Sequence, residues 1–133
     1  MSASFQTQTE LFAPPARLFD AWLSTIEQAT ITGAPALVEP FVGGRFSLWG
    51  GSVTGQLVFI QRPDRIAQTW RTEDFGPRAD DSRLELSFEP TARGTRLCIT
   101  QDRIPPALRR QFVYAWSQVY LPALSAWTAA LVA

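Results

Sequence analysis

The sequence predicts an α+β domain, with a curved antiparallel sheet of about six strands wrapped around a long C-terminal helix. Between residues 45 and 101, apolar and polar residues alternate in short segments separated by turn residues, which is typical of antiparallel strands with one covered face. The segment 111–133 contains no charged residue and repeats large apolar residues at helical spacing, so it can cover that face. The length of 133 residues fits one domain, which we expect to span residues 1–133.

The first elements are an edge strand and one or two short helices. Ser4–Phe12 has the β-favouring residues and weak alternation of a strand at a sheet edge. Pro14 and Pro15 then open a helix, because proline is tolerated in the first turn. Gly33 is expected to end a second short helix. The apolar residues at helical spacing, which we expect on the buried face, are Leu18, Phe19, Trp22, Leu23 and Ile26.

Five further strands follow from period-two alternation and turn signals. They are expected at Arg45–Trp49, Val53–Gln61, Arg65–Arg71, Arg83–Glu89 and Thr95–Gln101. Glycine pairs at 43–44 and 50–51 mark turns, since neither pair has the spacing of a phosphate-binding loop.

The last element is a helix of up to about 26 residues that begins at Pro105-Pro106. Pro122 should bend it, because the carbonyl of Gln118 loses its helical donor. A sheet that encloses such a helix is called a helix-grip fold. Its expected inward stripe is Leu108, Phe112, Trp116, Val119 or Tyr120, Leu124, Trp127 and Leu131.

Composition excludes several kinds of chemistry. The chain has no histidine, no lysine and one cysteine, Cys98, so Ser-His-Asp catalysis, Schiff-base lysines and Cys/His zinc sites are excluded. We expect no cofactor and no metal. Twelve acidic residues balance twelve arginines, which argues against nucleic acid as a partner.

The polar N-terminal residues 1–10 do not resemble a signal peptide. The uncharged segment 111–133 is long enough to cross a bilayer, but it contains proline and several polar residues. We therefore expect a soluble cytoplasmic protein with no membrane partner.

Several segments, in order along the chain, resemble one known family. They are Ala13-Pro14-Pro15 with Phe19–Leu23, Val42–Gly51, Arg65–Arg71, Gly94–Leu97 with Thr100-Gln101 and Ile104-Pro105, and Trp116 with Tyr120 and Pro122. Together they resemble bacterial single-domain members of the family of activators of a heat-shock chaperone ATPase. That family lies in the START-like, birch-pollen-allergen-like (SRPBCC) superfamily. The resemblance implies a helix-grip fold with an apolar cavity between sheet and helix, and it transfers no catalytic residue.

Strand and helix parity indicates which residues would line such a cavity. Gln68, Trp70 and Gln101 would add a few polar groups to an apolar space, as ligand pockets do. The alternative is that each amide satisfies a buried backbone group, and that the aromatic residues are simply core. The candidate lining residues are Phe46, Leu48, Gln68, Trp70, Leu86, Phe88, Ile99, Gln101, Phe112, Trp116 and Tyr120.

Other polar residues favour structural roles. The acidic residues Asp74, Asp80 and Asp81, near Arg71 and Arg78, are expected in a solvated loop that could cover a cavity mouth. Cys98 lies on the polar face of its strand and is expected to be passive.

Three functions follow, in this order of preference. The first is non-catalytic binding of a small hydrophobic or amphipathic molecule between sheet and helix. The second is regulation of a chaperone ATPase or another protein interaction, as the family resemblance implies. The third is an enzyme of the polyketide-cyclase type, which would need Asp20, Glu39 or Tyr120 in the cavity. A homodimer is compatible with each of them.

Overall fold

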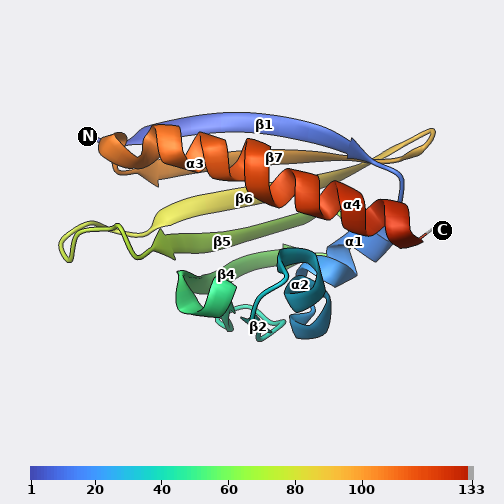
Figure 1. Ribbon diagram of the computed structural model, residues 1–133, viewed down its shortest axis with the longest axis horizontal. Coiled ribbons are helices and arrows are strands. Elements are labelled where there is room, and N and C mark those ends of the chain that lie inside the picture. The colour runs from blue at the N-terminus through green and yellow to red at the C-terminus, as the bar shows by residue number, and fades with distance from the viewer. Residues whose placement is uncertain (132–133) are drawn as a thin grey trace.

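The computed structural model describes residues 1–131, and the last two positions of the expected domain lie outside the described residues (Figure 1). The strands are β1 (Ala3–Leu11), β2 (Leu37–Val38), β3 (Arg45–Leu48), β4 (Val53–Gln61), β5 (Arg65–Thr72), β6 (Ser82–Thr91) and β7 (Gly94–Ile104). The helical elements are α1 (Pro15–Trp22), α2 (Thr25–Thr32), the 3₁₀ turns η1 (Trp49–Gly51) and η2 (Pro106–Leu108), α3 (Arg109–Ala115), the π-helical turn η3 (Trp116–Tyr120) and α4 (Leu121–Leu131).

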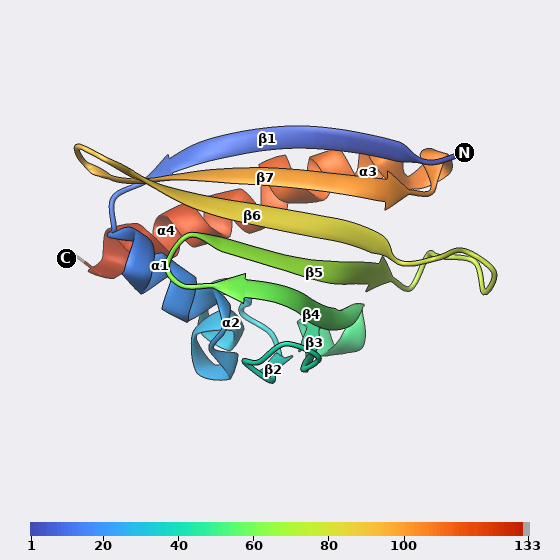
Figure 2. The ribbon, with the colours of Figure 1, turned by 180° about the vertical axis from the view of Figure 1, so that it is seen from behind.

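The strands form one antiparallel sheet in the order β1-β7-β6-β5-β4-β3-β2. The segments α3, η3 and α4 form a continuous helical rod across one face, while α1 and α2 lie near the β2 end (Figures 1 and 2). The predicted helix-grip architecture is confirmed. The sheet has one strand more than expected, because β2 is only two residues long and too short to show alternation.

The prediction that Ile26 is buried is wrong. The first helix ends at Trp22, and Ser24 caps a second helix by accepting a hydrogen bond from the Glu27 N–H at 3.2 Å. Helical spacing does not continue across this break, so Ile26 lies on the outer side and is 78% exposed. Gly33 ends α2 with a φ of 69°, as predicted.

The C-terminal helix contains a π-helical turn where a proline bend was expected. The Leu121 N–H donates to the Trp116 carbonyl, five residues back, immediately before Pro122. The wider turn accommodates a proline that has no N–H to donate. The extra residue shifts the helical phase, so Tyr120 is buried, whereas Val119 and Leu131 of the expected stripe are exposed.

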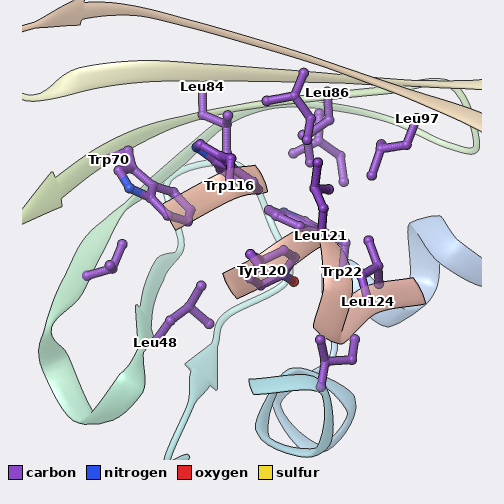
Figure 3. Packing of buried hydrophobic residues seen from close by; sticks show 14 of the residues in the cluster. Trp22, Leu48, Trp70, Leu84, Leu86, Leu97, Trp116, Tyr120, Leu121 and Leu124 are labelled. Carbon is purple, nitrogen blue, oxygen red and sulfur yellow. The ribbon is translucent and has the colours of Figure 1, made fainter. Parts of the chain in front are cut away.

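The core fills the space between the sheet and the helical rod. Leucines of β3, β6 and β7 meet Trp22, Trp116 and Tyr120 there (Figure 3). Among the described residues, no helix combines the length and apolar character needed to cross a membrane.

Candidate functional site

The interior between sheet and helix contains all the residues that the sequence predicted for a cavity lining. Strand alternation turns eight of them inward, and the helix adds Phe112, Trp116 and Tyr120. All eleven are buried, including Gln68 and Gln101.

Gln28 and Gln68 pair with aromatic residues at the end of the interior near α1 and α2. The Trp22 indole Nε1–H donates to Gln68 Oε1 at 2.7 Å, and the Tyr120 hydroxyl donates to Gln28 Oε1 at 2.7 Å. Gln28 Nε2 in turn donates to the Trp22 carbonyl at 3.0 Å. Gln28 was missed by the sequence analysis, because a single glutamine in a short polar helix gives no signal of burial.

Gln101 is part of a second chain of buried hydrogen bonds. The Trp116 Nε1–H donates to Gln101 Oε1 at 2.8 Å, and Gln101 Nε2 donates to Ser82 Oγ at 3.1 Å. The Ser82 hydroxyl donates to the Trp70 carbonyl. The two amides that were candidate ligand contacts, Gln68 and Gln101, therefore bond to other side chains, whereas the structural alternative expected buried backbone groups as their partners.

Trp116 is the central aromatic residue (Figure 3). Its ring stacks on Trp22 with centroids 6.4 Å apart, and it lies 5.3 Å from the rings of both Trp70 and Tyr120. Trp22 also meets Tyr120 edge to face at 5.3 Å. These rings occupy much of the space in which a ligand was expected.

Two small spaces remain beside these rings. The first, about 10 Å³, is lined by Gln28, Gln68 and apolar residues, and it is the size of one water molecule. The second, about 60 Å³, is lined by Trp49, Val53, Trp70, Thr72, Phe112, Ala115, Trp116 and Tyr120. Ligand pockets for drug-sized molecules usually have volumes of roughly 300–1,000 Å³. The deep cavity implied by the resemblance is therefore filled by side chains here.

The larger space has two unusual wall residues. Thr72 Oγ1 is buried and has no hydrogen-bond partner among residues 1–131. Trp49 has a φ of 50°, a conformation that side-chain-bearing residues seldom adopt. Its ring contacts Tyr120, with centroids 5.7 Å apart. Left-handed backbone at residues other than glycine clusters at functional sites, and a buried unpaired hydroxyl is uncommon in proteins.

The loop 73–81 closes one end of the interior. Phe75 is buried against Phe112, with ring centroids 5.8 Å apart. Arg71 holds the loop by donating to the carbonyls of Ala79 and Gly76 and to Asp81. Asp81 is thus paired rather than simply solvated. Asp74 accepts a hydrogen bond from Gln111 of α3 at 2.6 Å.

The acid–base candidates do not converge on one point. Asp20 is exposed and bonded to Arg62, and that hydrogen bond lowers the pKa of its carboxyl. Glu39 is exposed and accepts from the Arg45 N–H. Tyr120 does lie in the interior, where burial raises the pKa of its hydroxyl and keeps it protonated. Burial also raises the pKa of the Cys98 thiol, which opposes reactivity.

Comparison with known proteins supports the resemblance. A mouse activator of 90 kDa heat shock protein ATPase is 26% identical over 106 residues, which cover 80% of this chain and 31% of that protein. The chain therefore spans less than a third of the length of this curated relative. An HSP90 activator from Plasmodium falciparum is 27% identical, with a TM-score of 0.84 and coverage of 92% of this chain and 94% of that one. A Chromobacterium violaceum protein is 26% identical, with a TM-score of 0.74 and coverage of 94% and 96%.

The model of the family described as "Activator of Hsp90 ATPase homolog 1-like protein" matches residues 12–127. That match includes all three amide–aromatic pairs, the η3 turn and the loop held by Arg71. The chain belongs to this family.

Proposed function

We propose that the protein is a non-catalytic interaction module that regulates the ATPase activity of an Hsp90-type chaperone. The observation that carries the proposal is the likeness to the Plasmodium HSP90 activator, which covers nearly all of both chains. The filled interior adds support, because it leaves the surface as the part of the molecule available for recognition. This reverses the order of preference reached from the sequence, where ligand binding came first.

One apolar surface region fits a protein partner. Phe41 and Val42 lie in the turn before β3 and are 57% and 62% exposed. The Gly43 N–H donates to the Leu57 carbonyl and the Leu57 N–H donates to the Gly44 carbonyl, which places this turn next to the β4 segment that contains Val58 and Phe59, both also exposed. We call Phe41, Val42, Val58 and Phe59 the corner patch. Clustered exposed apolar residues are typical of interaction surfaces.

The test is the ATPase turnover of the Hsp90-type chaperone from the same organism, measured with increasing amounts of this protein. We expect a saturable change in turnover. The double variant F41S/V42S should abolish most of the change, because it removes apolar contact area without disturbing the core. Ile26→Ser is the matched control. Ile26 is an apolar residue that is more exposed than Phe41 and Val42, but it lies on α2 and not in the corner patch. An unchanged turnover at saturating protein would refute the proposal.

The proposal includes a cytoplasmic location, because the protein would have to share a compartment with such a chaperone. A single free cysteine is compatible with a reducing compartment. A homodimer is not required by this role.

A second candidate function is the binding of a small hydrophobic or amphipathic molecule beside Thr72. The supporting observation is the unpaired Thr72 hydroxyl in an aromatic-walled space of about 60 Å³. Trp70, Phe112, Trp116 and Tyr120 of the predicted lining surround this space. The other predicted lining residues would support these walls.

Phenol is a suitable probe for this site, because it has one aromatic ring and one hydroxyl. We expect it to shift the amide signal of Thr72 and the indole signal of Trp116 in two-dimensional NMR spectra, and Thr72→Val should weaken the effect. If saturating phenol leaves both signals unchanged, the site does not bind such molecules.

A further inference from the structure

The β1 strand is an unprotected edge of the sheet. It is nine residues long and pairs only with β7, and Figures 1 and 2 both show it as the outermost strand. Long edge strands usually carry lysine or proline that discourages further pairing. In β1 the single charged residue is Glu10, and there is no proline. At the opposite edge, β2 offers only two residues.

A groove runs between β1 and the helical rod. It has a volume of about 160 Å³ and an apolar floor formed by Phe5 and Trp116, both buried. Gln6 and Thr7 line it from the strand, whereas Val113 and Ser117 line it from the helix. A strand added to β1 would therefore place every second side chain at this groove.

The charge of the groove indicates the direction and chemistry of an added strand. Arg109 lines the groove and donates from Nε to the Ser4 carbonyl at 2.8 Å, near the start of β1. No carboxylate lies among the lining residues. A strand antiparallel to β1 ends beside the start of β1, so its C-terminal end would lie near Arg109. A carboxylate at that end could pair with the guanidinium.

We propose that β1 and this groove bind an extended peptide segment of a partner protein. The segment runs antiparallel to β1, presents alternating small apolar side chains to the groove, and carries a carboxylate near its C-terminal end that binds Arg109. Main-chain hydrogen bonds to β1 supply affinity, while the groove and Arg109 supply selectivity. This inference does not depend on the partner being a chaperone.

A second copy of β1 fits the groove less well. If two copies of β1 paired in antiparallel orientation with their Thr7 residues opposite each other, Glu10 of one copy would lie opposite Ser4 of the other. Residues directly opposite each other in antiparallel strands share a face, and Ser4 and Glu10 belong to the exposed outer face of β1. Phe5 belongs to the inner face, toward the helix. The only carboxylate of the copied strand would thus lie on the outer face of the sheet and not on the face that Phe5 shares with the floor of the groove.

The experiment measures fluorescence anisotropy of labelled synthetic peptides with the intact protein. One peptide alternates threonine and valine over eight residues and ends in glutamate with a free carboxyl group. The other has the same repeat but ends in glutamine amide. We expect the acidic peptide to bind, with chemical shift changes in β1, and the amide peptide to bind at least about fivefold more weakly.

Matched variants assign the effect to the groove. Arg109→Gln should weaken binding of the acidic peptide about fivefold or more, while Arg110→Gln, an exposed neighbour outside the groove lining, should change it less than about twofold. Ser117→Glu should also weaken it by repulsion. The proposal fails if neither peptide binds at millimolar concentration, or if the two arginine variants have equal effects. It also fails if light scattering shows a dimer and hydrogen exchange shows that the free-edge amides of β1 are protected in it.

Discussion

The two small spaces of the interior differ in their walls and in the hydrogen bonding of their polar groups: aliphatic residues and two glutamines line most of the first, whereas aromatic residues line most of the second. Beside α2, the Gln28 and Gln68 side chains pair with Tyr120 and Trp22, and a space of about 10 Å³ remains. Beside β5, Thr72 Oγ1 has no partner, and a space of about 60 Å³ remains. We refer to these as the paired and unpaired ends. The paired end holds the α1–α2 region against the helix through these hydrogen bonds, whereas no such side-chain bond from Thr72 is found among the described residues at the unpaired end.

The largest expected effect on the free energy of unfolding comes from substitution of Trp116, which lies between the two ends. Trp116→Ala would remove the ring that contacts Trp22, Trp70 and Tyr120, and it would leave Gln101 Oε1 without its donor. We expect the free energy of unfolding in urea to fall by about 3–5 kcal/mol. A loss below about 1 kcal/mol would show that the rings do not hold the interior together.

The next effect concerns the paired end alone. Gln28→Leu would leave the buried Tyr120 hydroxyl without its acceptor and the Trp22 carbonyl without the amide donor. We expect the free energy of unfolding to fall by about 2–3 kcal/mol. Urea titration measures this loss, and a neutral result would mean that the paired end does not depend on these hydrogen bonds.

The Tyr120 hydroxyl makes stability at the paired end depend on pH. Burial raises its pKa in the folded state, so its contribution is fully present below the unfolded value, near 10, and decreases as the pH rises above that value. Between pH 9 and 11, the unfolding free energy of the wild type should fall more steeply than that of Tyr120→Phe. Tyr114→Phe is the matched control, because it makes the same exchange at a tyrosine that is 62% exposed. Parallel curves for wild type and Tyr120→Phe would contradict the assignment.

The smallest expected effect belongs to the unpaired end. Thr72→Val replaces a hydroxyl that has no partner with a methyl group of similar size. We expect the free energy of unfolding to be unchanged or to rise by up to about 1 kcal/mol. A clear loss of stability in thermal and urea unfolding would show that the hydroxyl has a structural partner, and the contrast between the two ends would disappear.

Much of the fold could be predicted because alternation directly reports which face of a strand is covered. The same parity placed Gln68 and Gln101 correctly in the interior. The errors occurred where local periodicity is interrupted. Ile26 follows the break at Ser24, and Leu131 follows the extra residue of η3.

The filling of the interior could not be predicted, because it depends on pairs far apart in sequence. Trp22 bonds to a residue 46 positions away, and Gln28 to one 92 positions away. Each amide could equally face a ligand or another side chain, and only the three-dimensional arrangement distinguishes the two. Gln28 carried no sequence signal of either role.

The η3 turn has a consequence for insertions and deletions in this helix. Removing one residue between 116 and 120 would restore ordinary α-helical winding and rotate everything downstream by about 100°. Leu124 and Thr128, now buried, would then turn toward solvent. The number of residues in η3 therefore sets which face of α4, the last eleven residues of the rod, points toward the core. Within η3, substitutions should be tolerated better than insertions or deletions.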